Sequence, residues 1–497
     1  LKELPVTLRA TGALPHGVLV GASPEPFPAA TVTEALEAAL AANDPGRIAV
    51  ECAGTTLTWG ELATWSGSVA ARLCGQGIGP GSYVPVLAAR GPALVAAWAG
   101  VLRAGAAFVP LAMDTPAARL AYILDQTGAE TVLVCAEGAD LLAGLDVGAK
   151  PVLLADLRDL PQELAPKDAE PGRAEPGPGD PAAVIYTSGT TGRPKGVLVP
   201  HRGLLATSLW WGRDCGLGPD DRLLLTAGTA FDPAAYNVVQ SLLAGARLIL
   251  ADDVERRDPE ALLRLVRGPR GATVAGSVTP SLLRAMLTAD TADTADPTGT
   301  ADAPGTALRV LYAGGEALPR ELAARCATRW GTRIVNVYGP TEASCNSTYA
   351  PVDPASDTAP AIGRPLPGMR AYVLGPHGEE LPPGVPGELY IAGPGVALGY
   401  LAAPEQTTAA FLPDRYADAC GDTRPGARMY RTGDLAVLRE DGRLGYLGRA
   451  DDQLKILGNR LEPAEVVRLL EEHPAVTAAA VHAQGAPPAL VAHVTLA

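Results

Sequence analysis

Residues 186–196 read YTSGTTGRPKG and overlap the end of AAVIY (182–186), a short apolar run typical of a buried strand. Glycines at 189, 192 and 196 let the backbone adopt positive φ angles, and successive inward N–H groups then form an anion site. Further donors and one positive charge come from Thr187, Ser188, Thr190, Thr191 and Lys195. The stretch therefore predicts a loop that binds a polyphosphate group and releases it.

The same stretch does not follow the Walker A pattern GxxxxGK[ST], because Pro194 and Lys195 stand where that pattern requires Gly-Lys. A mobile surface loop without a ligand is the alternative interpretation, since glycine-rich loops are common. The ordered mixture of glycines, hydroxyls and a cation favours phosphate binding.

The sequence around this loop predicts an α/β fold. Short apolar runs such as RIAVECA (47–53) and TVLVCA (131–136) alternate with helical segments, which is typical of parallel strands in a layered architecture. The first expected helix has Thr31 or Thr33 as its N-cap. Two layered α/β subdomains are expected, at about residues 31–180 and 181–370.

The two ends of the chain differ from this pattern. Residues 1–30 contain several prolines and little periodicity, so they are expected to form an arm or linker. From about 371 to 449, short strands separated by Gly and Pro predict a small antiparallel, β-barrel-like unit that completes a core domain over residues 31–450. Residues 451–497 are expected to form a hinge and an incomplete, small α+β C-terminal subdomain. The TAD-rich stretch 288–305 is interpreted as a disordered insertion.

Charge and composition exclude several classes of function. Forty cationic and fifty-four anionic side chains give a net charge of −14, whereas nucleic acid as a main partner would require a basic surface. The longest apolar region, residues 84–112, is interrupted by Arg90 and Arg103 and is too broken to span a bilayer. Seven scattered cysteines without CxxC spacing are typical of reduced thiols. A soluble, cytoplasmic protein without a membrane partner is expected.

Two further motifs carry chemistry of their own. NVYGPTEAS (336–344) places Tyr338, a Gly-Pro turn and Glu342 together; an aromatic ring can stack on a purine, and a carboxylate can hold Mg²⁺ beside phosphates. YRTGDL (430–435) places Asp434 after a glycine turn, where it could accept hydrogen bonds from ribose hydroxyls. Taken singly, these residues have simpler interpretations, namely a core tyrosine, a solvated glutamate and a turn-capping aspartate.

Taken in order, the motifs resemble the adenylate-forming superfamily, specifically the amino-acid-activating adenylation domains of nonribosomal peptide synthetases. The resemblance covers about residues 30–497 and includes LTWGEL (57–62), LRAGAAFVPL (102–111), FDPAAY (231–236), YAGGEAL (312–318), GELYIAGPGVALGYL (387–401) and GRADDQLKILGNRLEPAEV (448–466). It implies that an amino acid and Mg-ATP give aminoacyl-AMP and pyrophosphate. The phosphopantetheine thiol of a peptidyl carrier protein would then take the aminoacyl group. Many family members also bind an MbtH-like protein, and the sequence leaves open whether this one does.

Carried over residue by residue, the resemblance implies catalytic roles for Thr190, Lys195, Glu342 and Lys455. Glu342 would hold Mg²⁺, and Lys455 would act in the thioester-forming arrangement. The ATP site would comprise Thr187, Ser188, Gly189, Thr190, Thr191, Gly192, Lys195, Gly314, Gly315, Glu316, Asn336, Val337, Tyr338, Gly339, Thr341, Asp434 and Arg449. In this scheme the loop wraps the β- and γ-phosphates, Tyr338 stacks on adenine and Asp434 binds the ribose. Asp451 would lie at the hinge.

FDPAAY carries the most informative residue for the substrate class. Asp232 matches the carboxylate that pairs with the α-ammonium in this family, and a buried carboxylate favours a ligand that brings a cation. The rest of the pocket would comprise Pro233, Tyr236, Ser277, Leu311, Ala313, Val337, Cys345 and Asn346. This mostly apolar lining with hydroxyl and amide groups predicts a small or medium, polar but uncharged side chain.

The chain departs from the family near its C-terminal end. The family's catalytic lysine for adenylation lies late in the C-terminal domain, and no lysine follows Lys455 here, so weak or absent adenylation by this chain alone is expected. Two alternative functions stay open. An acyl- or aryl-CoA ligase of the same superfamily is disfavoured by Asp232 and the YGPTE run, and a non-catalytic scaffold module is disfavoured by the intact nucleotide motifs.

Overall fold

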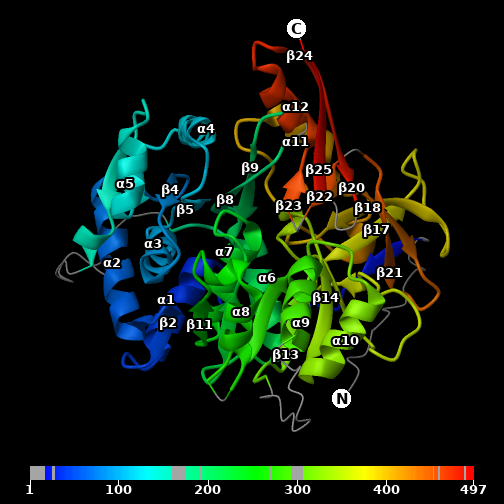
Figure 1. Ribbon diagram of the computed structural model, residues 1–497, viewed down its shortest axis with the longest axis horizontal. Helices are drawn as coiled ribbons and strands as arrows, with labels where there is room; N and C mark the ends of the chain where they lie inside the picture. Colours follow the sequence, from blue (N-terminus) through cyan, green and yellow to red (C-terminus); the bar gives the residue numbers. More distant parts are fainter. Residues whose placement is uncertain are drawn as a thin grey trace.

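The computed structural model describes residues 17–24, 28–158, 175–189, 192–268, 270–292, 306–451, 453–456, 459–485 and 489–496. Two large sheets with mostly parallel strands and one antiparallel sheet organise these residues, which confirms the predicted α/β class. In Figure 1 the first sheet and its helices lie at the left, the second sheet at the centre and the antiparallel sheet at the right.

The first sheet contains six strands in the order β7-β6-β4-β5-β8-β9, and only β8 and β9 pair antiparallel. The strands are β4 (Tyr83–Leu87), β5 (Ala107–Leu111), β6 (Thr131–Val134), β7 (Lys150–Leu153), β8 (Pro181–Thr187) and β9 (Lys195–Pro200). Their helices are α2 (Trp59–Gly75), α3 (Pro92–Arg103), α4 (Ala117–Thr127) and α5 (Ala136–Ala143). β5 and β6 bury every residue, as parallel strands covered on both faces do.

The second sheet has nine strands in the order β16-β15-β14-β13-β12-β10-β11-β2-β3. The strands are β2 (Ile48–Cys52), β3 (Thr55–Thr58), β10 (Arg222–Leu225), β11 (Arg247–Leu250), β12 (Val274–Val278), β13 (Val310–Ala313), β14 (Arg333–Tyr338), β15 (Thr348–Pro351) and β16 (Arg364–Pro365). The helices of this region are α1 (Val32–Ala42), α6 (His201–Cys215), α7 (Asp232–Leu243), α8 (Pro259–Val266), α9 (Pro280–Ala292) and α10 (Arg320–Trp330). Thr31 is the N-cap of α1, as one of the two predicted candidates.

The chain crosses between these two sheets twice. β2 pairs parallel with β11, so residues 48–58 belong to the second sheet, whereas β8 and β9 belong to the first. The predicted boundary at residue 180 therefore does not separate the two sheets. Pairing between strands about 200 residues apart depends on long-range contacts, which hydrophobic periodicity does not reveal.

The third sheet is antiparallel, as predicted from the short Gly- and Pro-bounded strands. It contains β1 (Val18–Val20), β17 (Arg370–Leu374), β18 (Pro386–Ala392), β19 (Phe411–Pro413), β20 (Arg428–Leu438) and β21 (Leu444–Arg449), and α11 (Pro404–Ala410) precedes β19. β1 pairs with β17, and Val18 is buried against it. Part of the expected N-terminal arm is thus an integral strand.

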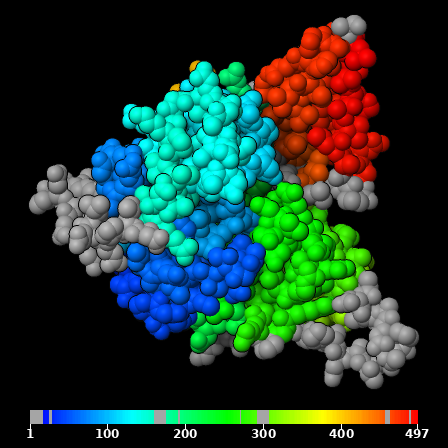
Figure 2. Space-filling model, turned by 60° about the vertical axis from the view of Figure 1, so that its left-hand side comes forward, coloured from blue at the N-terminus to red at the C-terminus, as the bar shows by residue number. Residues whose placement is uncertain are grey.

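The last described residues form β22 (Leu454–Ile456), β23 (Asn459–Leu461), α12 (Pro463–Glu471), β24 (Val476–Gln484) and β25 (Ala489–Leu496). Glu465 of α12 accepts a bond from Arg119 of α4 at 2.6 Å, and Figure 2 shows this red segment against the cyan segment that contains α4. Among the helices of the described ranges, none has the length and apolar character needed to cross a bilayer.

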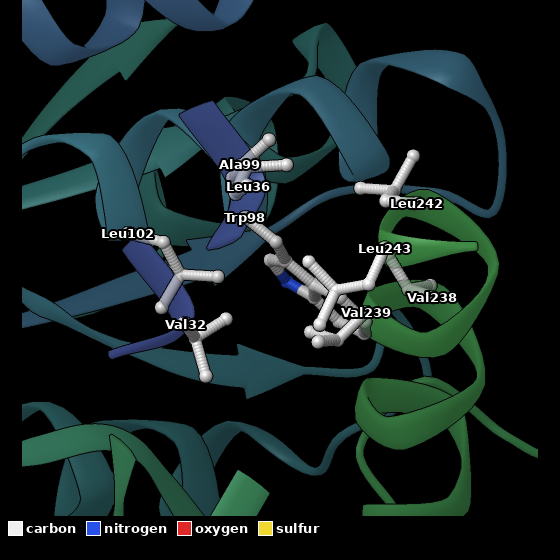
Figure 3. Close-up of a pocket in the computed structure, with 9 residues that line it drawn as sticks. All are labelled: Val32, Leu36, Trp98, Ala99, Leu102, Val238, Val239, Leu242 and Leu243. Carbon is white, nitrogen blue, oxygen red and sulfur yellow. The ribbon is translucent and has the colours of Figure 1, made fainter. Parts of the chain in front are cut away.

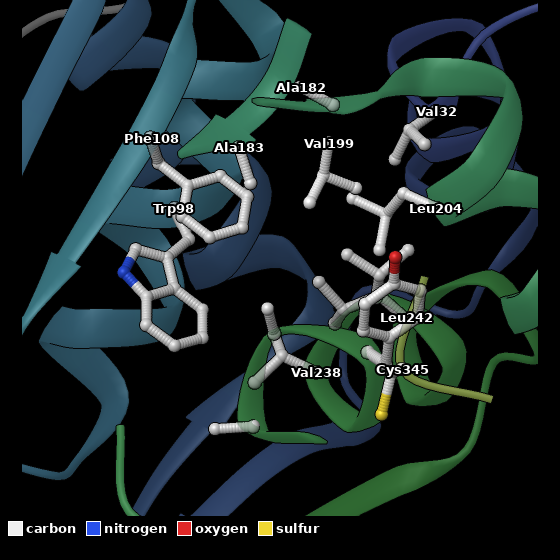
Figure 4. Packing of buried hydrophobic residues seen from close by; sticks show 14 of the residues in the cluster. Val32, Trp98, Phe108, Ala182, Ala183, Val199, Leu204, Val238, Leu242 and Cys345 are labelled. Atoms are coloured by element: carbon white, nitrogen blue, oxygen red, sulfur yellow. The ribbon is translucent and has the colours of Figure 1, made fainter. Parts of the chain in front are cut away.

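One continuous hydrophobic core joins the two large sheets. Figure 4 shows its centre, where Trp98 of α3 stacks on Phe108 of β5 with ring centroids 5.0 Å apart, close to Val238 and Leu242 of α7. Beside it, apolar side chains of α1, α3 and α7 line a cavity of about 10 Å³, drawn in Figure 3. That volume accommodates about one water molecule. The packing ties α7, which begins at Asp232, to both sheets.

Arg90 links the two sheets from the loop that follows β4. Its guanidinium donates to the carbonyls of Leu225 at 2.9 Å, Ala227 at 2.5 Å and Ala251 at 2.6 Å. These carbonyls lie at the C-terminal ends of β10 and β11, so one side chain from the first sheet satisfies three acceptors of the second. Burial, helped by Arg256, lowers the pKa of Arg90 to about 10.

The TAD-rich stretch is ordered at its start, contrary to the expected insertion. Residues 288–292 belong to α9, and Asp290 is buried. Its carboxylate accepts bonds from Arg329 at 2.7 Å and from the Trp330 indole at 3.0 Å, and also pairs with Arg267. Although burial opposes it, these bonds hold the pKa of Asp290 below its usual value. Residues 293–305 lie outside the described ranges.

His201, the first residue of α6, is fully buried directly after β9. Neither ring nitrogen has a hydrogen-bond partner within the described chain. Burial lowers the pKa of His201 to about 4, against the opposite effect of Asp180. The imidazole is therefore neutral at physiological pH.

Candidate active site

The predicted phosphate loop connects two antiparallel strands at the edge of the first sheet. Thr187 at the end of β8 pairs with Lys195 at the start of β9. Gly192 has a φ of 76° and donates its N–H to the Gly189 carbonyl at 2.9 Å. Ser188 is buried, and the buried Thr187 hydroxyl has no partner in the described part of the chain. Thr190 and Thr191 lie outside the described residues.

Helix α12 contacts this loop directly. The Arg468 guanidinium donates to the Gly192 carbonyl at 2.7 Å, and a Cβ added to Gly192 would lie 3.1 Å from the Ala464 carbonyl. Glycine is therefore needed there for its positive φ and for the close approach of α12. Arg468 was not among the predicted site residues, because only the docking of the C-terminal segment brings it to the loop.

Lys195 lies in a buried triangle with Glu342 and Tyr400. Lys195 Nζ lies 3.3 Å from Glu342 Oε1 and 3.1 Å from the Tyr400 hydroxyl, which in turn donates to Glu342 Oε1 at 2.9 Å. The exposed fractions are 8% for Lys195, 0% for Glu342 and 6% for Tyr400. The structure thus brings two predicted catalytic residues together and adds Tyr400, which sequence reasoning missed.

A tight turn after β14 directs Glu342 inward. A Cβ at Gly339 would lie 2.5 Å from the Cys345 carbonyl, so only glycine fits there. Thr341 and Glu342 fall in a short 3-10 turn over Thr341–Ala343, and Ser344 and Cys345 have φ angles of 61° and 66°. Left-handed non-glycine residues are uncommon and concentrate at functional sites.

Asp434 is the centre of the predicted nucleoside site. It is 2% exposed and accepts bonds from the Tyr338 hydroxyl at 2.5 Å, Arg449 Nη1 at 3.2 Å and the Tyr446 hydroxyl at 3.3 Å. Burial and the neighbouring Asp434 carboxylate raise the pKa of Tyr338 well above its usual value. Tyr446 is a second contact that the motifs did not reveal.

The predicted hinge residue is connected to this site. Arg449 Nε donates to Asp451 at 2.8 Å while Nη1 of the same guanidinium binds Asp434. Lys455 lies on β22, and its side chain is outside the described atoms. Asp451, the predicted hinge residue, and the predicted ribose-binding carboxylate therefore share one arginine.

The ends of β13 and β14 supply the remaining predicted nucleotide residues. Gly314 lies so close to Val337 that an added Cβ would be 2.9 Å from its side chain, and Gly315 has a φ of 83°. Glu316 accepts bonds from the Ser281 N–H at 3.1 Å and hydroxyl at 2.7 Å, at the start of α9, while its buried Oε1 has no partner within the described chain. Asn336 donates its amide to the Ala361 carbonyl at 2.8 Å.

The predicted substrate residues are only partly grouped. Burial and the Asp232 carboxylate raise the pKa of the Cys345 thiol well above its usual value. Burial also raises the pKa of the Tyr236 hydroxyl, and Cys345 and Asp232 contribute to that increase. The half-buried Asp232, which begins α7 and is followed by Pro233, therefore lies near the buried Tyr236 and Cys345. When the amide oxygen of Asn346 faces Trp211, it accepts a hydrogen bond from the indole N–H at 3.0 Å.

Three other predicted pocket residues differ from this group. Leu311 and Ala313 of β13 pack in a second core cluster with residues such as Ile334. Ser277 has a φ of 49°, and its buried hydroxyl has no partner in the described chain. Leu311 and Ala313 lie on the same face of β13, since residues i and i+2 of a strand share a face.

No three His, Cys, Asp or Glu side chains of the described residues come together as a ready-made metal site. A single carboxylate is nevertheless sufficient for Mg²⁺ that arrives with phosphates, because this ion keeps waters and is bound through one or two carboxylates plus substrate oxygens. The buried Glu342 fits that role.

A family model described as AMP-binding enzyme matches residues 37–401. The chain belongs to this family. It is 36% identical over 438 residues to the dimodular nonribosomal peptide synthase of Bacillus subtilis (strain 168), covering 88% of this chain and 17% of that protein. It is also 35% identical over 487 residues to malpibaldin synthetase of Mortierella alpina, covering 96% of this chain and 8% of the relative. The chain thus spans a small part of these relatives.

Solved structures agree with this placement. FmoA3 (S1046A), a nonribosomal peptide synthetase, is 32% identical with a TM-score of 0.74, over 86% of this chain and 44% of that one. The fused adenylation–PCP di-domain NpsA-ThdA from Klebsiella oxytoca has a TM-score of 0.78 at 24% identity, over 95% of this chain and 90% of that one, and so shares the fold. The chain is thus a member of the AMP-binding enzyme family, and its similarity to nonribosomal peptide synthetases agrees with the resemblance that its motifs indicated.

Proposed function

We propose that this chain activates an amino acid with ATP and transfers the aminoacyl group to a carrier protein. The amino-acid carboxylate oxygen attacks the α-phosphorus, a new carboxyl–phosphate bond forms, and the bond to the bridging oxygen breaks to release pyrophosphate. A phosphopantetheine thiol then attacks the acyl carbon and AMP leaves. The first step needs mainly positioning and stabilisation of phosphate charge.

The residues that would carry the first step are those around the phosphate loop. Lys195 and the loop N–H groups would bind the phosphates, and Asp434 would orient the ribose. Glu342 would hold Mg²⁺, which when bound neutralises phosphate charge. Because Lys195 and Glu342 are buried together, both act in a region of low dielectric, where charge stabilisation is stronger than in water.

Asp232 is the observation that supports an amino acid rather than another carboxylic acid. Asp232 begins α7, is half-buried, and lies near the buried Tyr236 and Cys345, whose raised pKa values keep both side chains neutral. The negative charge of an aspartate at this position complements the positive charge of the α-ammonium that an amino acid would bring.

Two hydroxyls among the predicted pocket residues support a substrate with a polar side chain of small or medium size. The Tyr236 and Ser277 hydroxyls are buried without hydrogen-bond partners among the described residues. Buried polar groups are costly unless they are bonded, so a substrate hydroxyl or amide would stabilise them. FmoA3, 31% identical with a TM-score of 0.75, has been solved with alpha-methyl-L-serine-AMP bound.

Amino-acid-dependent exchange of pyrophosphate into ATP tests this proposal when wild type is compared with Asp232→Ala. Loss of the carboxylate that would pair with the α-ammonium predicts an about 100-fold or larger fall in kcat/KM for the amino acid. Asp258→Ala is the matched control, because Asp258 starts α8 as an N-cap bonded to the Glu260 N–H. Equal effects of both substitutions would reduce Asp232 to an acidic residue that stabilises the start of its helix and would contradict the proposal.

A further inference from the structure

Tyr400 links the two charged groups that phosphate and metal binding require. Its hydroxyl accepts from Lys195 Nζ at 3.1 Å and donates to Glu342 Oε1 at 2.9 Å, and Lys195 Nζ lies 4.5 Å from the centre of its ring. The hydroxyl therefore forms hydrogen bonds with both members of the Lys195–Glu342 pair, while the ring makes a cation–π contact with the ammonium.

The backbone around Tyr400 is bound to both elements that carry these charges. The Leu401 N–H donates to the Gly196 carbonyl at 2.8 Å, next to Lys195 on β9. The Ala397 N–H donates to the Glu342 carbonyl at 2.9 Å. Residues 397–401 thus connect β9 to the Glu342 turn. The backbone bonds to β9 and to this turn together fix the position of the Tyr400 hydroxyl.

Side-chain contacts restrict Tyr400 further. Its N–H donates to the Thr407 hydroxyl at 2.9 Å, and its ring packs edge-on against Phe411 at 5.3 Å between centroids. A Cβ at Gly399 would lie 2.5 Å from the Thr407 side chain, so this glycine permits the approach. A side chain held this firmly loses little further entropy when it orients a partner.

Binding of Mg-ATP requires the Lys195–Glu342 pair to separate, since the ammonium is needed at phosphate and the carboxylate at the metal. Separating two buried charges is unfavourable unless each keeps a partner. The Tyr400 hydroxyl already donates to Oε1, so it can retain Glu342 when Lys195 leaves.

We infer that Tyr400 is a positioning residue that orients Glu342 for Mg²⁺ and lets Lys195 exchange its partner from carboxylate to phosphate. This role rests on the function proposed above. It concerns nucleotide and metal binding, and therefore predicts effects that do not depend on which carboxylic acid is activated.

Tyr400→Phe isolates the hydroxyl, because the phenyl ring can still pack on Phe411 and face the Lys195 ammonium. Tyr390→Phe is the matched control, since the Tyr390 hydroxyl also bonds a glutamate, Glu388, at 3.3 Å, with both residues on β18. Two readouts are needed: equilibrium binding of ATP while Mg²⁺ is titrated, and exchange kinetics with ATP varied at saturating amino acid.

Loss of one hydrogen bond to a charged group predicts an about tenfold rise in the Mg²⁺ concentration at half-maximal ATP binding, with a similar rise in KM for Mg-ATP and kcat changed less than about threefold. Tyr390→Phe should change neither. A Tyr400→Phe protein that is less heat-stable but keeps the wild-type Mg²⁺ midpoint would overturn the inference, because the hydroxyl would then only support the fold.

The two binding readouts also separate this inference from the proposed function. If no amino acid supports exchange but Tyr400→Phe still shifts the Mg²⁺ midpoint, amino-acid activation fails and the Tyr400 role stands. If exchange is normal in wild type and the midpoint is unchanged in Tyr400→Phe, only the Tyr400 role fails.

Discussion

Asp434 provides the most quantitative test of the nucleotide site. Its two carboxylate oxygens have about four lone-pair positions, and three donors already occupy them, from Tyr338, Arg449 and Tyr446. A ribose that brings two hydroxyls must therefore use the remaining position and displace one weak donor, and the 3.3 Å bond from Tyr446 is the longest of the three.

Asp434→Asn removes the charge and one acceptor while the shape is preserved. Its amide nitrogen cannot face Arg449, which is itself a donor, so it should turn toward Tyr338, whose hydroxyl can accept instead. The variant should fold, but it loses about one charge-assisted bond to the ribose, worth about 1.5–3 kcal/mol. That corresponds to an about 10- to 150-fold rise in KM for ATP.

Comparison of ATP with 2′-deoxy-ATP assigns this loss to the ribose. Wild type should use 2′-deoxy-ATP about tenfold or more less efficiently, whereas Asp434→Asn should discriminate by less than about threefold, because the interacting partner is already gone. Unchanged discrimination in a folded Asp434→Asn protein would refute the assignment of the ribose to this carboxylate.

Three further outcomes follow from buried groups elsewhere. Burial lowers the pKa of His201 from 6.5 to about 4 on folding, so the free energy of unfolding falls as pH falls from about 6.5 toward 4. Between pH 7 and 5 this decrease is about 2 kcal/mol. His201→Gln should remove this part of the pH dependence of the melting temperature. Arg90→Ala leaves three buried carbonyls without their donor and should destabilise the protein by about 3 kcal/mol. Calorimetry should then show the first unfolding transition at a lower temperature. An unchanged transition temperature would contradict the role of Arg90 in linking the two sheets. Arg119→Ala breaks the ion pair to Glu465 and should speed amide hydrogen exchange in α12 about threefold, with no change in α9 as the internal control.

Much of the grouping of side chains at the candidate nucleotide site could be predicted because its residues lie in short, contiguous motifs. In YGPTE the chemistry is local: Gly339 allows the tight turn that directs Glu342 inward. Asp434 and Arg449 belong to two motifs 15 residues apart, and antiparallel pairing of β20 with β21 brings them opposite each other. Such short-range pairing follows from the strand pattern.

Contacts between distant segments could not be predicted in the same way. Tyr400 lies 205 residues from Lys195 and Arg468 lies 276 residues from Gly192. Nothing in the local pattern of GYL or EVVRLLEE distinguishes a side chain that faces the phosphate loop from one that faces solvent. The same limit applies to β1, because the short apolar run Val18–Val20 can be assigned as a strand only from its pairing with β17.

The central claim is that an amino acid is the acid activated, and the most direct measurement compares amino acids with their des-amino counterparts in ATP–pyrophosphate exchange. The longest natural form of the polypeptide should be used, so that any C-terminal residues needed for adenylation are present. We expect exchange with one or a few amino acids bearing small or medium polar side chains, and an at least about 100-fold lower kcat/KM for the acid lacking the α-amino group. Equal exchange with the des-amino acid, or exchange only with aryl or fatty acids, would contradict amino-acid activation by this chain.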